Sequence, residues 1–337
     1  MLLGCGGAAQ PPAAGWTKQT TLEQMGSAPS FKDIFFLDAQ TGWAAGNNNF
    51  LAKTSDGGAT WARVLPENDS RYVGTVRFVS PTVGLFVYEN TVDGTTGIYR
   101  TTDGGTTWNQ VLGAYIGAQF IGGLQDLRMV DAQTGVAVGL KGTIVHTTDG
   151  GATWTMATVD HDYYAKPVDF YGVDFIDTTR GFVCGIDGTI LKTTDAGATW
   201  TTVLSDDFTA QTTTLTGTGR QFALRFLDAN DGVLTTDTGL FKTADGGTTW
   251  KRVAMDLVES NTNDYALGLS DASTLYATAG QHEMVASSDL GETWSEVNVP
   301  STTGMISPLG FTLVAAYSFV AGHGWAIGGN GEVYTTP

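Results

Sequence analysis

Short apolar segments recur along this chain at nearly regular intervals, separated by clusters of Gly, Thr, Asp and Asn. The first series of segments lies at residues 34–37, 76–79, 127–130, 173–176, 224–227, 266–270 and 316–320. A second series, which usually opens with glycine, follows at 42–46, 84–88, 135–139, 181–185, 232–236, 274–280 and 324–328. These near-continuous runs of small and apolar residues are typical of strands that are covered on both faces.

A third strand in each period leads into a turn that reads Ser/Thr-x-Asp-x-Gly-x-Thr-Trp. The aspartates of its six copies are Asp56, Asp103, Asp149, Asp195, Asp245 and Asp289, and they lie 47, 46, 46, 50 and 44 residues apart. The Asp carboxylate can accept hydrogen bonds from the backbone N–H groups after it, and the Gly supplies positive φ at little cost. A fourth strand starts at the Trp. We expect the six tryptophans to fill equivalent apolar sites: Trp61, Trp108, Trp154, Trp200, Trp250 and Trp294.

Four strands per period are typical of one propeller blade, and seven first strands predict seven blades. Residues 331–337 end where a seventh turn would begin, while residues 14–19 resemble residues 152–157, which follow a turn. The N-terminal segment is therefore expected to supply the fourth strand of the last blade, which removes an exposed sheet edge. The sequence predicts an all-β, seven-bladed propeller of four-stranded antiparallel blades that forms one domain over residues 15–337.

The charge of the chain limits its partners. Seventeen basic and 34 acidic residues give a net charge of −17, which repels nucleic acid and anionic membrane surfaces. Nucleic acid is therefore not expected as a partner. We expect a monomer without a cofactor.

The two cysteines differ in their surroundings. Cys184 lies in an apolar run and is expected to be a buried small hydrophobe. Cys5 follows Leu2-Leu3-Gly4, which resembles the end of a bacterial lipoprotein signal, where the cysteine is lipidated. The charged and long apolar regions of such a signal are missing, so an unrelated leader is the alternative. Residues 1–14 are accordingly expected to be a signal remnant and flexible tether, on an exported periplasmic or cell-surface lipoprotein.

The repeated polar residues favour structural roles. The turn aspartates recur one per blade and cannot converge on one catalytic or metal site. We expect the basic residues three positions before them to be solvated on an outer strand: Lys53, Arg100, His146, Lys192 and Lys242. The four histidines show no metal-ligand spacing, so no metal site is predicted. Because the tryptophans are all used by the blades, none is left for an open sugar platform.

Long connections between blades are the first candidate binding region, because loops on one side of a rigid scaffold commonly carry binding. They cover residues 65–74, 112–125, 160–171, 204–221, 255–264 and 298–312. Two of them hold aromatic residues that suit a protein-contact patch: Tyr115, Phe120, His161, Tyr163, Tyr164 and Tyr171. Packing of these rings over the tops of the blades is the alternative.

Arginines are the second candidate. Arg77, Arg128 and Arg225 occupy the same position in three first strands, which line the channel of a propeller, and Arg220 lies nearby in the sequence. Such a group could bind a carboxylate or another anion. Ion pairing with Asp174 or neighbouring acids inside the ring is the alternative.

The repeated turn resembles the Asp-box, or BNR repeat, of sialidase-like propellers. The Arg-Ile-Pro signature of sialidases is absent and the nine arginines are scattered, so sialidase catalysis is not expected. The pattern Gly-Trp-Ala-x-Gly, a short turn and Gly-x-Ile-x-x-Thr-x-Asp-Gly-Gly-x-Thr-Trp, visible in residues 135–154 and 181–200, resembles the photosystem II stability/assembly factor family. That resemblance implies a non-enzymatic assembly chaperone in the thylakoid lumen of a photosynthetic host, anchored at its N-terminus, with an arginine-rich patch for which Arg77, Arg128 and Arg225 are the candidates.

The leading functional hypothesis is thus a non-catalytic propeller scaffold that binds a protein partner and serves the assembly or quality control of a membrane or exported complex. The alternative is a glycan-binding or glycan-hydrolysing sialidase-like propeller that uses loop carboxylates such as Asp162, Asp206, Asp207 or Glu259. A purely structural surface protein is a third possibility.

Overall fold

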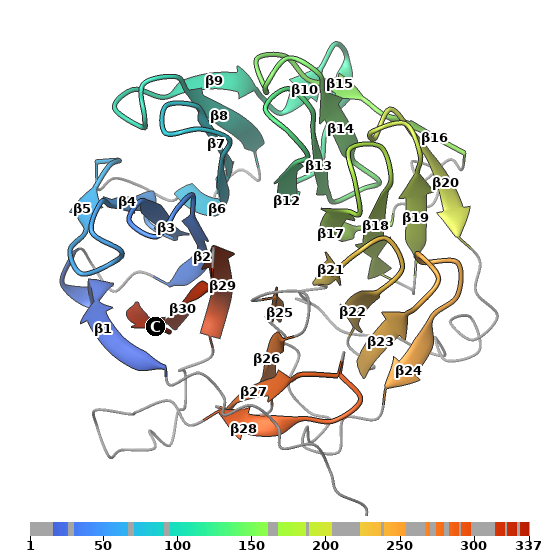
Figure 1. The fold of residues 1–337 in the computed structure, drawn as a ribbon. Helices are drawn as coiled ribbons and strands as arrows, with labels where there is room; N and C mark the ends of the chain where they lie inside the picture. Colours follow the sequence, from blue (N-terminus) through green and yellow to red (C-terminus); the bar gives the residue numbers. More distant parts are fainter. Residues whose placement is uncertain are drawn as a thin grey trace, which may run out of the picture.

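A computed structural model shows seven antiparallel sheets arranged in a ring around a central axis (Figure 1). It describes residues 16–25, 30–66, 71–90, 95–160, 168–186, 189–203, 223–236, 239–253, 267–269, 274–279, 283–289, 291–297, 314–320, 322–328 and 331–336. The first strand of each sheet lies nearest the axis and the fourth lies outermost. The predicted seven-bladed propeller is confirmed.

The strands of each blade follow the chain from the axis outward, apart from the fourth strand of blade 7. Blades 1 to 3 contain β2 (Phe31–Phe36), β3 (Gly42–Gly46), β4 (Phe50–Thr54) and β5 (Ala62–Arg63); β6 (Arg71–Phe78), β7 (Gly84–Asn90), β8 (Thr96–Thr101) and β9 (Asn109–Leu112); and β12 (Leu124–Met129), β13 (Gly135–Gly139), β14 (Ile144–Thr147) and β15 (Thr155–Met156). Blades 4 and 5 contain β17 (Phe170–Phe175), β18 (Gly181–Gly185), β19 (Ile190–Thr193) and β20 (Thr199–Val203); and β21 (Leu224–Phe226), β22 (Gly232–Thr236), β23 (Gly239–Thr243) and β24 (Lys251–Val253). Blades 6 and 7 contain β25 (Leu267–Leu269), β26 (Leu275–Ala279), β27 (Glu283–Ser287) and β28 (Ser295–Val297); and β29 (Val314–Val320), β30 (His323–Gly328), β31 (Glu332–Thr335) and β1 (Thr17–Thr21).

The ring is closed by the N-terminal strand, as predicted. Strand β1 runs antiparallel to β31, with Thr17 opposite Thr335, and Lys18 Nζ lies 3.1 Å from Glu332 Oε1. Trp16, at the start of β1, is 1% exposed and meets Tyr276 and Phe319 edge-on, at centroid distances of 5.6 and 6.0 Å. The first strand of the chain thereby joins blade 7 to the aromatic residues of blades 6 and 7.

Short strands that the repeat does not predict occur within the predicted connection 112–125 and directly before the predicted connection 160–171. The connection after β9 forms a small hairpin of β10 (Tyr115–Ile116) and β11 (Gln119–Phe120). The connection after β15 adds β16 (Thr158–Val159) in parallel to the outer edge of blade 4, and Asp160 there accepts a hydrogen bond from Thr202 N at 3.0 Å. A single 3₁₀ turn, η1 (Leu22–Met25), follows β1. Within the residues that the structure describes, no helix has the length and apolar character needed to span a membrane.

Each repeated turn is held by one set of hydrogen bonds. In the fourth copy, Asp195 Oδ1 accepts from Thr199 N at 2.9 Å and Asp195 Oδ2 accepts from Thr199 Oγ1 at 2.6 Å. Thr193 Oγ1 accepts from Gly197 N at 3.0 Å, and Trp200 Nε1 donates to Gly197 O at 2.9 Å. The carboxylates are thus engaged by their own turns, which is the structural role that the spacing predicts.

The turns also join neighbouring blades. The glycine two residues after each turn aspartate has positive φ, and in blades 2 to 5 it lies against the second strand of the preceding blade, so that a Cβ at Gly151 would overlap Leu85 and one at Gly197 would overlap Val136. Trp325 Nε1 of blade 7 donates to Gly57 O of blade 1 at 2.8 Å. Glycine is required here for close approach as well as for its backbone conformation.

Three of the five basic residues before the turns, Lys53, Arg100 and Lys242, make contacts between blades, so the expectation that these residues are merely solvated on an outer strand is wrong for these three. Lys53 Nζ of blade 1 donates to Gly104 O in the turn of blade 2 at 3.0 Å. Arg100 Nε of blade 2 donates to Gly150 O of blade 3 at 2.8 Å, and Lys242 forms an ion pair with Glu292. A side chain on a third strand reaches the next turn because the sheets stand face to face around the ring.

Apolar side chains fill the space between the blades. Trp154, Trp200 and Trp250 are buried, whereas Trp61, Trp108 and Trp294 are partly exposed. The two tryptophans of the second strands stack on the first strand of the next blade: Trp43 lies 3.5 Å from Phe78 and Trp325 lies 3.8 Å from Phe36, centroid to centroid. Cys184 is buried, as expected, and burial raises the pKa of its thiol.

Replacement of the closing tryptophan tests the closure of the ring. We expect Trp16→Ala to lower the free energy of unfolding by about 3–5 kcal/mol, because it removes a fully buried indole that packs between two blades. Guanidinium unfolding followed by circular dichroism measures this loss. Trp16→Phe, which keeps an aromatic ring, should lose clearly less; equal stability of the alanine variant and the parent would contradict the closure.

Acid should weaken the repeated turns. Hydrogen bonds from the hydroxyl and the backbone N–H of Thr107 lower the pKa of Asp103 to about 2. A carboxyl whose pKa is lowered by folding stabilises the protein above its unfolded pKa of about 3.9 and loses that contribution as the pH falls toward its folded pKa. We therefore expect the urea midpoint to fall between pH 4 and pH 2, and to fall less steeply in Asp103→Asn than in the parent.

The matched control for this prediction is Asp231→Asn. Among the described residues, none donates a hydrogen bond to the Asp231 carboxylate, so this variant should keep the pH dependence of the parent. Identical acid profiles for Asp103→Asn and the parent would show that the turn carboxylate contributes nothing.

Candidate partner-binding site

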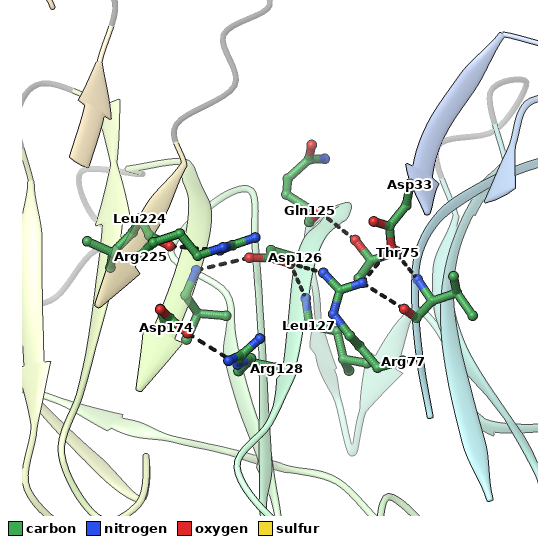
Figure 2. A network of polar contacts seen from close by, with 12 residues as sticks. Asp33, Thr75, Arg77, Gln125, Asp126, Leu127, Arg128, Asp174, Leu224 and Arg225 are labelled. Carbon is green, nitrogen blue, oxygen red and sulfur yellow. Dashed lines mark hydrogen bonds and ion pairs between the residues drawn. The ribbon is translucent and has the colours of Figure 1, made fainter. Parts of the chain in front are cut away.

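Three of the four predicted arginines, Arg77, Arg128 and Arg225, belong to one polar network on the first strands of the blades, which lie nearest the axis and are called the inner wall here (Figure 1 and Figure 2). Arg77 on β6, Arg128 on β12 and Arg225 on β21 pair with the equivalent second-strand residues Leu85, Val136 and Val233. In blade 4 the same register is taken by Asp174, which pairs with Phe182. The regular repeat therefore places an acidic residue between the arginines of blades 3 and 5.

Arg77 is an internal ion-pair partner. Its Nη1 lies 2.6 Å from Asp33 Oδ2 and its Nη2 lies 3.8 Å from Asp126 Oδ1, and the side chains of Arg77 and Asp33 are 13% and 12% exposed. Burial opposes the charge of Arg77, but the two carboxylates raise its pKa. Burial raises the pKa of Asp33, which the Arg77 charge and the backbone N–H of Val76 counteract. Ion pairing inside the ring, the alternative for these arginines, applies to Arg77 and also to Arg128, which pairs with Asp174.

The other two arginines are less enclosed. Arg128 Nε lies 3.2 Å from Asp174 Oδ1, but the Arg128 side chain is 41% exposed while Asp174 is 2% exposed. Within the described part of the chain, no hydrogen bond uses either Nη atom of Arg128. Arg225 Nη1 donates to Leu224 O at 2.7 Å and has no carboxylate partner among the described residues. Arg128 and Arg225 therefore keep donors that could serve a partner.

The acidic residues of the inner wall connect adjacent blades through backbone hydrogen bonds. Asp33 Oδ2 accepts from Val76 N at 2.8 Å, Asp126 Oδ2 from Val173 N at 3.1 Å and Asp174 Oδ2 from Phe226 N at 2.9 Å. Sequence reasoning missed Asp33 and Asp126, which lie directly after a β-bulge in β2 and β12. Both residues lie two positions before the repeat position that holds the arginines. This shared position in the repeat was the sequence signal that could have identified them.

Charges on this wall are balanced. The described residues that meet there are three guanidinium groups, Arg77, Arg128 and Arg225, and three carboxylates, Asp33, Asp126 and Asp174. Because opposite charges alternate around the wall, the arginines do not create a broad positive surface. Their binding capacity is confined to the donors that the carboxylates leave unused.

A cavity of about 250 Å³ opens beside Arg128, and its lining comes from the inner strands of blades 1 to 3: Phe35, Arg77, Phe78, Val79, Arg128, Met129, Asp131 and Ala132. It lies at the ends of β6 and β12, where the chain turns toward the second strands of blades 2 and 3. Those ends hydrogen-bond to the repeated turns, as in Gly150 N to Gln133 O at 2.7 Å. The cavity therefore opens on the face of the ring that carries the repeated turns, opposite the long connections.

The aromatic candidates on the long connections are a separate surface. Tyr115 and Phe120 are 62% and 36% exposed, and their rings meet edge-on at 5.5 Å on the β10–β11 hairpin. Lys141 Nζ lies 5.0 Å from the Phe120 ring, while Tyr171 packs against the core of blades 4 and 5. The structure thus does not bring Tyr171 and the hairpin together with the arginines.

Several other predicted residues lie outside the described part of the chain: Cys5, His161, Tyr163, Tyr164, Arg220, Asp162, Asp206, Asp207 and Glu259. Among the described residues, no group of three or more His, Cys, Asp or Glu side chains is arranged to hold a metal ion.

Comparison with solved structures shows which folds are similar. A structure described as YCF48 bound to D1 peptide has a TM-score of 0.68 at 16% identity and covers 98% of both chains. YCF48 from Cyanidioschyzon merolae has a TM-score of 0.63 at 19% identity over 96% of this chain and 98% of that chain. A streptogramin B lyase has a TM-score of 0.66 at 11% identity over 96% and 97%. At these identities the likeness establishes the propeller fold alone.

Sequence comparison defines the family. A search of curated proteins finds no match. The family profile described as photosynthesis system II assembly factor YCF48 matches residues 13–115 and 119–257, which is well over half of the chain. The chain belongs to the YCF48 photosystem II assembly factor family.

Proposed function

We propose that this protein is a non-catalytic scaffold that binds a protein partner through the inner wall of the ring, and that it serves the assembly or quality control of a membrane or exported complex. The observation that carries the proposal is the half-exposed Arg128, whose Nη donors are unused by the described residues. Membership of the YCF48 family supports a protein partner, and the structure of YCF48 with a D1 peptide is a precedent for peptide binding by a relative.

The use of the inner-wall acids supports a scaffold rather than an enzyme. General acid–base chemistry needs a carboxyl that can reach its substrate and exchange a proton. Here the carboxylates of Asp33, Asp126 and Asp174 accept backbone N–H bonds from the next blade, and two of the three also face an arginine within 3.2 Å. These groups stabilise the ring.

The lipoprotein-like sequence that ends at Cys5 supports a location outside the cytoplasm. Residues 1–14 act as a tether and Cys5 carries the lipid, which holds the propeller at a membrane outside the cytoplasm, or in the thylakoid lumen of a photosynthetic host. A membrane-bound partner is then within reach. Metabolic labelling with a palmitate analogue, with Cys5→Ser as the control, tests this anchor.

Crosslinking capture from host membranes tests the partner proposal. The purified parent serves as bait beside Arg128→Gln, Arg225→Glu and the control Lys251→Glu, whose substitution lies on the exposed outer edge of blade 5. We expect one membrane or exported protein to be recovered by the parent and the control, and at least about tenfold less of it by the arginine variants, since a charge-assisted hydrogen bond is lost. Equal recovery by all folded variants would refute the role of the arginines.

Arg77 should serve the fold rather than the partner. We expect Arg77→Met to lower the free energy of unfolding by about 3 kcal/mol, the lower end of the range for breaking a buried ion pair, because it leaves Asp33 without its counter-charge and the pair is slightly exposed. Urea unfolding measures the change. Arg225→Met, which breaks no ion pair among the described residues, is the control, and equal stability of both variants would contradict the assignment.

A further inference from the structure

The cavity beside Arg128 combines apolar walls with a single usable cation. Phe35, Phe78, Val79 and Met129 supply the apolar part of the lining, and Ala132 lies exposed in the turn at the blade 3 side. A volume of about 250 Å³ is that of one or two side chains rather than a helix or a folded domain. The cavity therefore suits a short insertion from a partner.

Of the two arginines that line the cavity, only Arg128 offers its charge. Arg77 lies within 2.6 Å of Asp33 and stacks beside Phe35, with its guanidinium carbon 5.8 Å from the ring centre. Arg128 lines the cavity and pairs with Asp174 through Nε, and none of the described residues forms a hydrogen bond with its Nη atoms. One carboxylate can be bound there by a charge-assisted, two-pronged hydrogen bond.

The surrounding charges limit what that carboxylate can belong to. Asp131 lies in the lining and stays ionised, because hydrogen bonds from the backbone N–H groups of Gln133 and Thr134, at 2.7 and 2.6 Å, lower its pKa. The whole protein carries a net charge of −17. Asp131 and the overall negative charge would repel each carboxylate of an acidic run, whereas a segment with one carboxylate beside an apolar side chain carries less repelled charge and can place that carboxylate on Arg128.

We infer that the cavity is a recognition site for a partner segment in which one acidic side chain stands next to one large apolar side chain. The acidic side chain contacts Arg128, and the apolar one fills the space between Phe35, Phe78 and Met129. The site lies on the face with the repeated turns. This inference rests on the proposed function, since it names the kind of segment that the partner presents.

Peptide binding tests the inference directly. The full protein is titrated into peptides that are blocked at both ends and carry an uncharged fluorophore, and the fluorescence anisotropy is followed. The parent peptide is Gly-Ser-Gly-Phe-Glu-Gly-Ser-Gly; its companions replace Glu by Gln, replace Phe by Ser, or carry four consecutive Glu. We expect the Phe-Glu peptide to bind at least about tenfold more tightly than each companion.

Substitutions in the lining complete the test. Arg128→Gln and Ala132→Glu should each weaken the Phe-Glu peptide at least about tenfold, the second by placing a carboxylate at the rim while the Arg128–Asp174 pair stays intact. Lys251→Gln, which makes the same change in net charge as Arg128→Gln but on the outer edge of blade 5, should leave binding unchanged. If Arg128→Gln fails to fold, Ala132→Glu decides the outcome alone.

Three results would overturn the inference: equal binding of the Phe-Glu and Phe-Gln peptides, tightest binding of the four-Glu peptide, or tighter binding of an unblocked peptide that ends in Phe with a free carboxylate. Failure of this inference can be told apart from failure of the proposed function by combining the peptide and capture experiments. If Ala132→Glu loses the Phe-Glu peptide but captures the membrane partner as well as the parent does, the cavity is not the partner contact and the scaffold function stands. If the parent captures no partner, the scaffold function fails whatever the peptides show.

Discussion

The ring depends on the hydrogen-bonded turn between the third and fourth strands of each blade. Within the turn, one carboxylate and one hydroxyl satisfy several backbone N–H groups, so the chain reverses direction without leaving polar groups unpaired. Its glycine then brings the backbone against the second strand of the preceding blade, where Leu85 and Val136 leave no room for a Cβ. One local motif thus fixes both the shape of a blade and the distance to its neighbour.

Contacts between the blades follow from that arrangement. Because each turn packs against the preceding blade, Lys53 of blade 1 and Arg100 of blade 2 can donate hydrogen bonds to the turns of blades 2 and 3. On the inner side, Asp33, Asp126 and Asp174 bond to a backbone N–H of the blade that follows. Each interface between blades is therefore held by three kinds of contact at different distances from the axis: apolar packing, cationic side chains and buried carboxylates. Because neighbouring blades stabilise one another in this way, no blade needs a large core of its own.

The same carboxylates determine what the inner wall can bind. Opposite charges that alternate around a ring cancel at a distance, so the wall does not attract anions over a long range. Directional donors are left over where an arginine extends beyond its carboxylate partner, as Arg128 does, or has no such partner among the described residues, as with Arg225. Beside Arg128, a cavity lined partly by apolar side chains makes the site selective for shape as well as charge. The exposed Tyr115 and Phe120, on the opposite face, form a second and independent surface.

The sequence by itself determined the blade count, the order of strands, the role of the turn aspartates and the closure by the N-terminal strand, because each is written in a local pattern repeated at a fixed period. It also placed Arg77, Arg128 and Arg225 in one register, since equivalent positions of a repeat face the same way. Only the tertiary structure decided that Arg77 is paired with Asp33 and Asp126, that Arg128 is paired with Asp174, and that Lys53 reaches the next blade. These contacts join residues about one period apart in the chain, and a β-bulge before Asp33 and Asp126 turns them toward the next blade. Local patterns carry no signal for such pairings, which arise only when the sheets are packed face to face.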